Sequence, residues 1–556
     1  MDDFDIIIVG AGSAGCTLAG RLTEDPNVRV LLLEAGRAGE HLFVRMPAAN
    51  GFVFGKPRFD WGYYTAPQAE LGGRRIYWPR GRGLGGSSTI NGMIYIRGNA
   101  RDYDGWRQRG LEGWSYADVL PYFRRSEGNP RGDDGFHRPD GPLRTGPAGN
   151  AGRIDDIFLA AARQAGYPYN PDFNGPSQFG CGIYDMTVDR GRRSTTARAY
   201  LEPARGRGNL TVLTDALALS VAFEGRRTIG VTVGRAGRTE TYRAGREVVL
   251  AQGAIGSPQL LLLSGVGPAD DLRRLGIAVV ADLPGVGANL HDHPDVPVQY
   301  ACPRPELSFS RYLRADRALG LGLRYLLTGG GPGAAPLWSA GAFKALNPGA
   351  EVPDLQAFFT PMVIKEDPRG DTGVGTPLFG IGSLAARKSA IDGFQFDVNQ
   401  MHPRSRGSLK LASTDPREHP VLDPRYLAEE IDRRDMVAAV RMAREIAHQK
   451  AFDGVRGPEL SPGAELTTDA AILDGVRRTL ISGYHPVGTC KMGTAADPMA
   501  VTDAELRVRG VEGLRVVDAS IMPELVTGNT NGPTIMIAEK AADMILGRPP
   551  LPRAEV

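Results

Sequence analysis

Residues 6–15 of the chain read IIIVGAGSAG, an apolar run that leads directly into a G-x-G-x-x-G turn. A strand that enters this turn and continues as a helix is typical of a dinucleotide-binding unit. Gly10 permits the tight turn, Gly12 lets a pyrophosphate approach the backbone, and Gly15 allows the helix to pack closely on the strand. We expect that helix over residues 14–23, with its free N–H groups directed at the phosphates.

A second apolar run, VRVLLLE at residues 28–34, ends in the carboxylate of Glu34. This acid follows Gly15 by roughly 20 residues, the spacing at which a ribose hydroxyl finds its acceptor. A ribose acid disfavours a 2′-phosphate, so FAD or NAD fits better than NADP. A glycine-rich turn without a ligand is the alternative interpretation, but a strand, helix and acid in register favour a dinucleotide.

The chain has 556 residues, which is too long for one ordinary hydrophobic core and predicts two domains. Its net charge is +2, from 65 basic and 63 acidic residues without long runs, which disfavours nucleic acid and anionic membrane surfaces as partners. No apolar stretch is long enough to span a bilayer, and the first residues lack the features of a signal peptide. The four cysteines are far apart, without a C-x-x-C pair or zinc spacing, so we expect a reduced, cytoplasmic protein without a metal site.

Two later segments also combine glycines with a backbone suited to a ligand. Residues 81–91, GRGLGGSSTIN, place consecutive glycines and hydroxyls before a helix-compatible run, which suits a phosphate or a flat ring. Residues 247–258, EVVLAQGAIGSP, form another apolar strand that enters a glycine turn. Because these elements are far apart in the sequence, we expect a discontinuous cofactor domain.

The predicted fold is α/β (α+β overall), with a Rossmann-type cofactor domain and a second, covering domain made of a sheet and helices. Strand patterns at residues 355–359, 394–399 and 407–411 and a helix at 431–449 indicate the covering domain. The chain then returns to the cofactor domain with a strand at 514–518 and a helix at 533–546. The predicted boundaries are 1–155, 195–304 and 471–556 for the cofactor domain, and 156–194 and 305–470 for the substrate-binding domain.

Together these segments resemble the glucose–methanol–choline family of FAD oxidoreductases over essentially the whole chain. Residues 81–91 resemble the first signature of the family, and residues 253–267, GAIGSPQLLLLSGVG, resemble the second. Residues 482–493, SGYHPVGTCKMG, resemble the segment that carries the catalytic histidine. Residues 528–534, GNTNGPT, lie where the family carries a second catalytic His or Asn. The most similar branches are bacterial choline-dehydrogenase-type enzymes and alcohol dehydrogenases.

The resemblance implies FAD as the cofactor and assigns residues to each part of it. Some members attach FAD covalently through a histidine in the first signature, but residues 88–91 read STIN here, so we predict non-covalent FAD. The implied cofactor-binding residues are Gly10, Gly12, Ser13, Ala14 and Gly15 for the pyrophosphate, Glu34 for the ribose, Gly81, Leu84, Gly85, Gly86, Ser87, Asn91 and Gly92 for the ribityl chain and ring, Ala218 for adenine, Asp518 and Ala519 for the phosphate–ribityl region, and Thr530 for the pyrimidine edge.

The resemblance further implies oxidation of a primary alcohol to an aldehyde, with His485 as the base and Asn529 as its partner. The reaction removes the alcohol proton while the carbon gives a hydride to flavin N5, and histidine can serve as such a base near neutral pH. Asn529 would orient the alcohol and hold the developing alkoxide charge. Taken alone, a histidine beside a proline in a glycine-rich loop is more often structural, and the surrounding motif reverses that interpretation.

The substrate is the least defined feature. Choline-specific relatives place a carboxylate against the trimethylammonium group, and Ser339 stands where we expect that acid, which disfavours choline. Trp338, Phe358, Phe359 and Met362 suggest an apolar pocket for an aliphatic or aromatic primary alcohol. Packing in the core of the covering domain is an equally good interpretation of each of these four side chains.

A dehydrogenase with a quinone-type acceptor is favoured over an oxidase that reduces O2 to H2O2. A hydroxynitrile-lyase-like protein that keeps FAD without redox turnover, and a non-catalytic flavoprotein, are the alternatives from other classes. His291 and His293 form an H-x-H pair that could suggest a metal, but hydrogen bonds that order a loop are the favoured interpretation. The roles of these two histidines and of His402 stay open, as does the oligomeric state.

Overall fold

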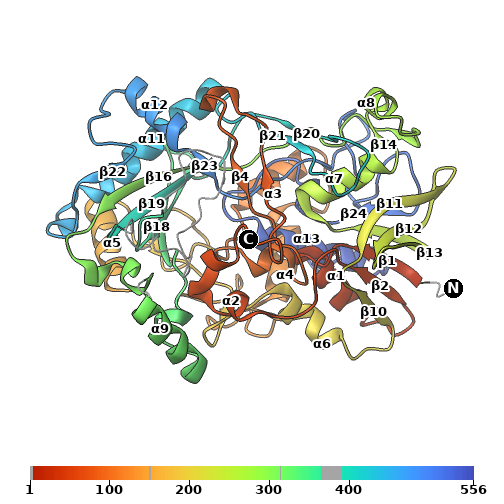
Figure 1. The fold of residues 1–556 in the computed structure, drawn as a ribbon, viewed down its shortest axis with the longest axis horizontal. Helices are drawn as coiled ribbons and strands as arrows, with labels where there is room; N and C mark the ends of the chain where they lie inside the picture. Colours follow the sequence, from red (N-terminus) through yellow and green to blue (C-terminus); the bar gives the residue numbers. More distant parts are fainter. Residues whose placement is uncertain (1–3, 149–151, 314, 365–390, 556) are drawn as a thin grey trace.

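The computed structural model describes residues 4–148, 152–313, 315–364 and 391–555, which form two large sheets side by side (Figure 1). The sheet near the N-terminus has the order β10-β2-β1-β13-β12-β11, and β24 pairs with β13. Its strands are β1 (Phe4–Val9), β2 (Val30–Leu33), β10 (Leu210–Leu213), β11 (Leu217–Glu224), β12 (Arg227–Arg235), β13 (Arg238–Leu250) and β24 (Leu514–Val516).

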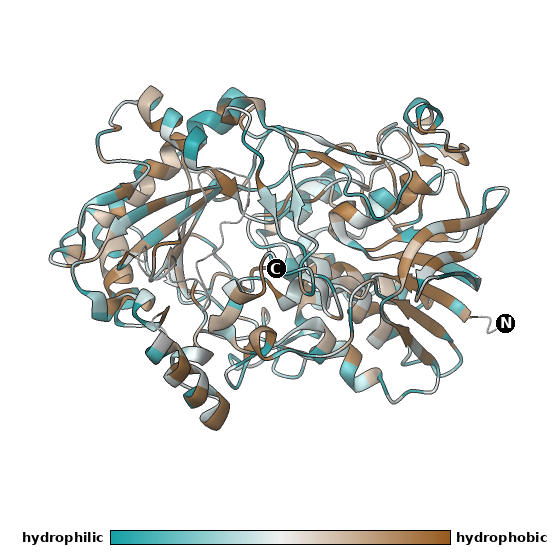
Figure 2. Ribbon diagram, viewed as in Figure 1, coloured by the Kyte–Doolittle hydropathy of each residue, from teal (hydrophilic) through white to brown (hydrophobic). Residues whose placement is uncertain are grey.

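The centre of this first sheet is parallel and fully buried. β1 runs parallel to β2 and β13, while β10 extends β2 and β24 extends β13 in the same direction. Ile6, Ile7 and Ile8 are all completely buried, as expected for a parallel strand covered on both faces. Helix α1 (Ser13–Leu22) follows β1 directly and packs on α13 (Asn531–Ile545). The predicted strand–turn–helix unit is therefore confirmed, and its strands are among the most apolar parts of the ribbon (Figure 2).

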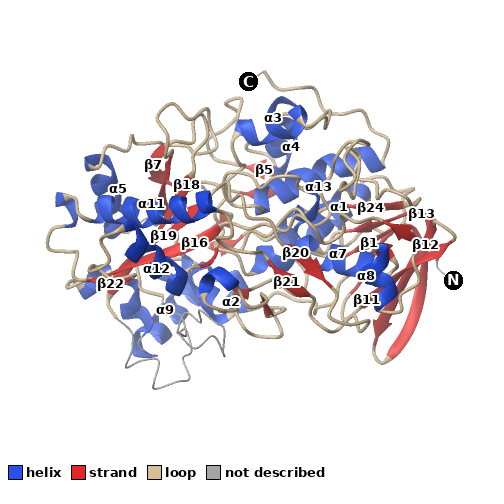
Figure 3. Cartoon of the chain, turned by 90° about the horizontal axis from the view of Figure 1, so that it is seen from above, coloured by secondary structure: helices blue, strands red, loops and turns tan. Residues whose placement is uncertain are grey.

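The second sheet is antiparallel throughout and has the order β22-β16-β19-β18-β17-β7, with β23 paired to β16. Helices α5 (Arg153–Gln164), α11 (Glu430–Ala447) and α12 (Asp469–Thr479) cover one of its faces (Figure 3). Its strands are β7 (Gly180–Ile183), β16 (Pro294–Ala301), β17 (Ala340–Lys344), β18 (Leu355–Thr360), β19 (Gly393–Gln400), β22 (Glu459–Ser461) and β23 (Ile481–Ser482).

Alternation along β19 shows how the faces of this sheet differ. Phe394 and Phe396 lie on the helix-covered face, where both rings contact Phe452. Asp397 points to the opposite face, where it bonds the indole of Trp338. Successive side chains of a strand point to opposite faces, so the second sheet buries an apolar layer under its helices and turns a polar layer toward the first sheet.

The α/β fold class is confirmed, and the predicted strands at 355–359 and 394–399 and the helix at 431–449 coincide with β18, β19 and α11. Two assignments to sheets were wrong. Strands β16 and β23 pair within the second sheet, although the predicted boundaries at 304 and 471 place them in the cofactor domain. The run at 407–411 forms β20 (Ser408–Lys410), which in the described part of the chain forms a separate two-stranded sheet with β21 (Val421–Asp423). Strand periodicity identifies a strand but not its neighbours, which explains both differences. The domain boundaries otherwise stay a prediction.

The remaining helices and strands lie outside the two large sheets. No helix in the described ranges combines the length and apolarity needed to cross a membrane. The other helices are α2 (Leu42–Arg45), α3 (Ala100–Gln108), α4 (Tyr116–Ser126), α6 (Glu202–Ala204), α7 (Gly253–Leu263), α8 (Ala269–Arg274) and α9 (Ala315–Thr328). The other strands are β3 (Tyr63–Tyr64), β4 (Tyr77–Trp78), β5 (Glu127–Gly128), β6 (Leu143–Arg144), β8 (Val188–Asp189), β9 (Arg192–Arg193), β14 (Val266–Gly267) and β15 (Ala281–Asp282).

Candidate active site

One large cavity is lined by residues of both sheets. Its walls include the glycine turn after β1, the loop at residues 79–94, the start of α7, the segment after β23 and the turn before α13. The polar face of the second sheet closes its far side. Of the predicted cofactor residues, the following line the cavity: Gly10, Gly12, Ser13, Ala14, Glu34, Gly81, Gly86, Ser87, Asn91, Gly92, Ala218, Asp518, Ala519 and Thr530.

The first glycine turn is shaped by close backbone contacts that only glycine permits. Gly10 has a φ of +97°, and a Cβ there would lie 2.8 Å from the carbonyl oxygen of Ala251. A Cβ on Gly15 would lie 1.8 Å from the carbonyl oxygen of Gly10. Gly15 therefore permits the close approach of helix and turn, as predicted, but it lies beneath the cavity and does not line it.

The second glycine segment packs directly on the first. The N–H of Gly85 donates to the carbonyl of Ala11 at 2.8 Å, and a Cβ on Gly86 would lie 2.6 Å from the Cα of Gly12. Gly85, whose N–H is used in this contact, and the neighbouring Leu84 are not among the residues that line the cavity. Their contact with the cofactor stays a prediction.

Glu34 stands at the carboxyl end of β2 and ties both glycine segments together. One carboxylate oxygen accepts from the N–H of Ala11 at 2.9 Å, and the other accepts from Gly36 at 2.7 Å and from Gly83 at 3.0 Å. A carboxylate offers about four lone-pair sites, so Glu34 can still accept from a ligand hydroxyl. Its place in the cavity fits the predicted ribose acceptor.

Asp518 organises the N-terminus of α7 on the other side of the cavity. Its carboxylate accepts from the N–H of Gly253 at 2.9 Å and from the hydroxyl of Ser257 at 2.5 Å. The glycine backbones, the N-terminus of helix α1 and the separate carboxylates of Glu34 and Asp518 form a cradle that fits a dinucleotide. The residues present thus fit FAD.

The two predicted catalytic residues lie together. Asn529 Nδ2 and His485 Nε2 are 3.1 Å apart, and both residues line the cavity. The other ring nitrogen of His485, Nδ1, lies 3.0 Å from Nδ1 of His293. His293 Nε2 in turn lies 3.1 Å from the carbonyl oxygen of Met401.

This chain of contacts fixes the tautomer of His485. A backbone carbonyl can only accept, so His293 Nε2 carries its proton and, in a neutral ring, Nδ1 is a bare acceptor. His485 must therefore donate from Nδ1, which leaves its Nε2 as a lone pair directed at Asn529. The structure presents His485 Nε2 in the form that can take a proton.

Both imidazoles are held neutral. Burial, helped by the positive charge of Arg80, lowers the pKa of His485 to about 3. Burial and the neighbouring His485 lower the pKa of His293 well below its usual range. The backbone N–H of His485 donates to Asp292 at 2.7 Å, and the same carboxylate accepts from the hydroxyls of Tyr426 and Ser482. Asp292 thus fixes the loop that carries the histidine.

The far wall of the cavity combines carboxylates with aromatic rings. Asp397 on β19 accepts from the indole N–H of Trp338 at 3.2 Å, and both line the cavity together with Asp295 and Phe358. In the register of β16 and β19, Pro297 faces Asp397, which places Asp295 and Asp397 on the same face of the sheet. Burial raises the pKa of Asp397 to about 6.

Among the described residues, the donors to Asp397 are all neutral. Besides Trp338, they are the hydroxyl of Thr360 at 3.0 Å and the amide of Gln395 at 2.6 Å. In the described ranges no lysine or arginine pairs with this carboxylate. A buried, partly desolvated carboxylate beside an indole ring is a suitable environment for a ligand cation.

Two predicted pocket residues are part of the core instead. Phe359 lies on the helix-covered face of β18, with its ring stacked 4.8 Å from that of Phe158. Met362 is buried in a small cluster with Leu337. Phe358 lines the cavity and Phe359 does not, because adjacent residues of a strand point to opposite faces.

The histidines whose roles were open have distinct positions. His291 orders a loop, since Nδ1 bonds the carbonyl of Asn289 at 2.6 Å and Nε2 accepts from the N–H of Leu525 at 3.0 Å. His402 bonds the hydroxyl of Thr527 at 3.1 Å. His293 is the contact of His485 that motif analysis missed, and its position in the H-x-H pair was the available signal.

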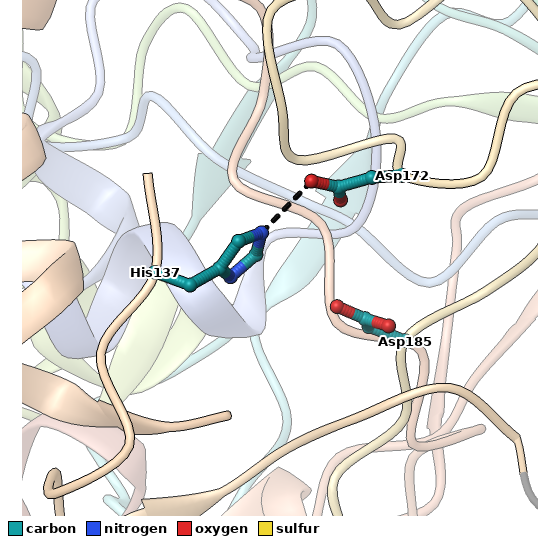
Figure 4. A group of neighbouring side chains, drawn as sticks. All are labelled: His137, Asp172 and Asp185. Carbon is teal, nitrogen blue, oxygen red and sulfur yellow. Dashed lines mark hydrogen bonds and ion pairs between the residues drawn. The ribbon is translucent and has the colours of Figure 1, made fainter. Parts of the chain in front are cut away.

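A separate group of side chains, His137, Asp172 and Asp185, has the composition of a metal site (Figure 4). His137 Nε2 bonds Asp172 at 2.9 Å, and Nδ1 bonds Glu127 at 2.8 Å. Burial lowers the pKa of His137, but these two hydrogen bonds outweigh it and raise the pKa to about 9. A doubly protonated imidazole has no lone pair for a metal, so we interpret this group as a buried ion-pair network.

A parallel sheet with a dinucleotide cradle, joined to a cavity with a neutral histidine base, defines a dinucleotide-dependent oxidoreductase. Residues 4–295 and 403–538 match two family models, both described as GMC oxidoreductase, and the chain belongs to this family. It is an FAD-dependent enzyme that oxidises a CH–OH donor.

The chain is similar to enzymes that act on alcohols. It is 47% identical over 560 residues to the oxygen-dependent choline dehydrogenase of Pseudomonas fluorescens, covering 100% of this chain and 95% of that protein. It is 45% identical to the mitochondrial choline dehydrogenase of Homo sapiens, over 99% of this chain and 91% of that protein. Among solved structures, pyridoxine 4-oxidase from Mesorbium loti superposes with a TM-score of 0.87 at 32% identity, covering 98% of this chain and 100% of that one.

Proposed function

We propose that the protein oxidises choline, or a primary alcohol with the same quaternary ammonium head, to the corresponding aldehyde. The observation that carries this proposal is the acidic and aromatic wall of the cavity, formed by Asp295, Asp397, Trp338 and Phe358. A quaternary ammonium group needs an anion or an aromatic ring to replace its hydration, and this wall offers both. The names of the relatives support the same substrate.

This proposal replaces the expectation of an aliphatic or aromatic alcohol, which was drawn from four apolar side chains. It also replaces the argument against choline, which was drawn from Ser339. The acid that a cationic substrate requires need not stand at that position of the chain, because β16 and β19 present Asp295 and Asp397 to the cavity instead. Asp397 has only neutral donors in the described part of the chain, so a substrate cation would supply the missing countercharge.

In the proposed reaction His485 Nε2 accepts the alcohol proton, and Asn529 Nδ2 donates to the alcohol oxygen as negative charge develops there. Bound FAD supplies the hydride acceptor at flavin N5. The lowered pKa of His485 keeps Nε2 free of a proton at neutral pH, and the contact with His293 holds the ring in the required tautomer. The acidic wall would hold the substrate cation while its hydroxyl reaches this pair.

We further propose that FAD is bound without a covalent link, because residues 79–94 contain no histidine. A quinone-type acceptor is our proposed electron route, with reduction of O2 as the alternative that the experiment below distinguishes. We propose a reducing, cytoplasmic setting, which four free cysteines support.

The test is anaerobic reduction of the FAD-loaded protein, followed by absorption of the flavin. We expect choline to bleach the flavin at least ten times faster than 3,3-dimethylbutan-1-ol, its uncharged isostere, and faster than 1-hexanol. Equal rates for the charged and uncharged isosteres would contradict a cation site, and no bleaching by any alcohol would contradict the activity. Return of colour in air would identify an oxidase, whereas return only with a quinone would identify a dehydrogenase.

A further inference from the structure

Gln356 lies next to the catalytic pair without lining the cavity. Its side chain is completely buried on β18, and Nε2 donates to Asn529 Oδ1 at 3.3 Å. The same nitrogen donates to the hydroxyl oxygen of Tyr184 at 3.4 Å. Tyr184 in turn donates its proton to the carbonyl of Ala357 at 3.0 Å.

These contacts extend the histidine chain into one continuous hydrogen-bonded path. It runs from the carbonyl of Met401 through His293, His485, Asn529, Gln356 and Tyr184 to the carbonyl of Ala357. Both ends are backbone carbonyls, which can only accept. One residue inside the path must therefore donate in both directions, and the hydrogen bonds on either side of it must point toward the two carbonyls. Gln356 is that residue, because its Nε2 donates to both Asn529 and Tyr184.

The direction matters most at Asn529, whose amide can be turned either way round. As it lies, Oδ1 accepts from Gln356 and Nδ2 faces the lone pair of His485 Nε2. If the amide were inverted, Oδ1 would face that lone pair and Nδ2 would face the NH2 group of Gln356. The first contact would then join two acceptors, and the second would join two donors.

We propose that Gln356 is a positioning residue that fixes the amide of Asn529 with Nδ2 toward His485 and the substrate oxygen. This inference rests on the proposed roles of His485 and Asn529. It assigns the orientation of the Asn529 amide to a side chain on the second sheet. Gln356 acts only through Asn529 and is not itself a catalytic residue.

Gln356 is well placed for this task because its backbone is held on both sides. It pairs with Phe343 of β17 and with Asn399 of β19 in the antiparallel register. Its Oε1 has no hydrogen-bond partner among the described residues. The side chain is therefore used only as a donor, and glutamate in its place would keep the shape while reversing the polarity.

Several ionisable groups surround His485 and bear on any change in its protonation. Asp292 accepts from its backbone N–H, and Arg80 donates to the carbonyl of Tyr484, the preceding residue. His293 contacts Nδ1, and Tyr426 reaches Asp292. The charge of His402 also acts on His293. All of these groups are unchanged by substitutions at Gln356.

The test compares Gln356→Glu with Gln356→Met. A carboxylate at 356 accepts from Asn529 Nδ2 and inverts the amide, so His485 Nε2 can bond Oδ1 only if it is protonated. We expect kcat/KM to fall at least 100-fold at pH 7, with its acid limb moved up by more than one pH unit. Gln356→Met leaves the amide free to invert, and we expect a fall of about tenfold. Gln164→Glu is the matched control, because Gln164 is exposed on α5 and its Oε1 accepts from the N–H of Ala451 at 2.9 Å, a bond that a carboxylate keeps. Its activity should stay within twofold of the wild type.

A second measurement does not depend on turnover. In protein labelled with 15N-histidine and loaded with FAD, the eight histidines give few ring signals, and His485→Gln identifies those of His485. We expect a bare Nε2 at pH 7 in the wild type and a protonated Nε2 in Gln356→Glu. A bare Nε2 in that variant, or wild-type kinetics in Gln356→Met, would overturn the proposal. Failure of the wild type to oxidise any alcohol would instead overturn the proposed function, because the NMR comparison still reports the amide orientation.

Discussion

At the scale of single residues, the site depends on imidazoles that burial keeps neutral. A histidine side chain in water has a pKa of about 6.5. In this structure burial and the charge of Arg80 lower the pKa of His485 to about 3. Its proton is held on Nδ1 by the contact with His293. The ring is thus prepared as an acceptor before the substrate arrives, which avoids reorganisation during proton transfer.

Removing this acceptor should stop the chemistry without disturbing the cofactor. We expect His485→Gln to lower the rate of anaerobic flavin reduction by about 100- to 10,000-fold, the range for loss of a general base. The FAD content measured by absorption should stay at the wild-type level, because the cradle lies on other elements. A variant that reduces flavin at more than a tenth of the wild-type rate would show that another group is the base.

Asp397 should control the binding of a cationic substrate. We expect Asp397→Asn to raise KM for choline by at least tenfold and to leave KM for 3,3-dimethylbutan-1-ol within about twofold. Steady-state kinetics with both alcohols decide this, and an equal effect on both would mean that the substitution changes only shape.

The same carboxylate predicts a pH dependence. Burial raises the pKa of Asp397 to about 6, so protonation removes its charge as the pH falls through that value. We expect kcat/KM for choline to fall below about pH 6, mainly through KM, whereas the profile for the uncharged isostere should lack this limb. Identical profiles for the two alcohols would contradict the assignment.

At the scale of elements, strand alternation decides which side chains reach the substrate. Phe358 and Phe359 are neighbours in the sequence, but Phe358 lines the cavity and Phe359 stacks on Phe158 under the helices. The sequence could not separate them, because it does not say which face of β18 meets the first sheet.

The glycine turn was easier to predict from the sequence, since the local backbone geometry requires glycine at Gly10 and Gly15.

Phe358 and Phe359 provide a matched test. Phe359→Ala removes a ring from the core and should destabilise the protein by about 3–5 kcal/mol with little change in KM. Phe358→Ala should change KM for the substrate and lower the melting temperature less. Thermal melting followed by flavin fluorescence and steady-state kinetics test both expectations. A larger kinetic effect for Phe359→Ala would place its ring, rather than that of Phe358, in the pocket.

At the scale of the whole molecule, the ion-pair network at His137 joins segments from several parts of the chain. It connects Glu127 after α4 with Asp172 in the loop before β7. Asp185 after β7 lies beside these groups and is paired with Arg131. No single segment could hold an imidazolium in this buried position. The network therefore stabilises the arrangement of these segments.

The charge of His137 should make stability depend on alkaline pH. Its folded pKa of about 9 lies above the value of roughly 6.5 expected in the unfolded chain, so the stabilisation is complete below pH 6.5 and is lost as the pH rises through 9. We expect the wild-type melting temperature to fall between pH 7 and 9.5. His137→Gln should be less stable at pH 6, by about 1–3 kcal/mol, and should lose less over the same window. Parallel melting curves for the two proteins would contradict this role.

The sequence by itself determined the elements whose requirements are local. The glycine turn at residues 10–15, the acid at position 34 and the motif around His485 each encode their conformation within a few residues, and the structure brings them into one cavity. The family resemblance and the α/β class followed from these elements and are confirmed by the comparisons.

Only the tertiary structure decided how distant strands and side chains meet. The assignment of β16 to the second sheet, the acidic wall of Asp295 and Asp397, and the contacts of His293 and Gln356 with the catalytic pair all depend on pairing between segments far apart in the chain. Strand periodicity fixes which residues share a face of a strand. It does not fix which strand pairs with it, in which register, or what packs on that face. The physical reason is that these contacts are set by the packing of the two sheets, which no local stretch of sequence encodes.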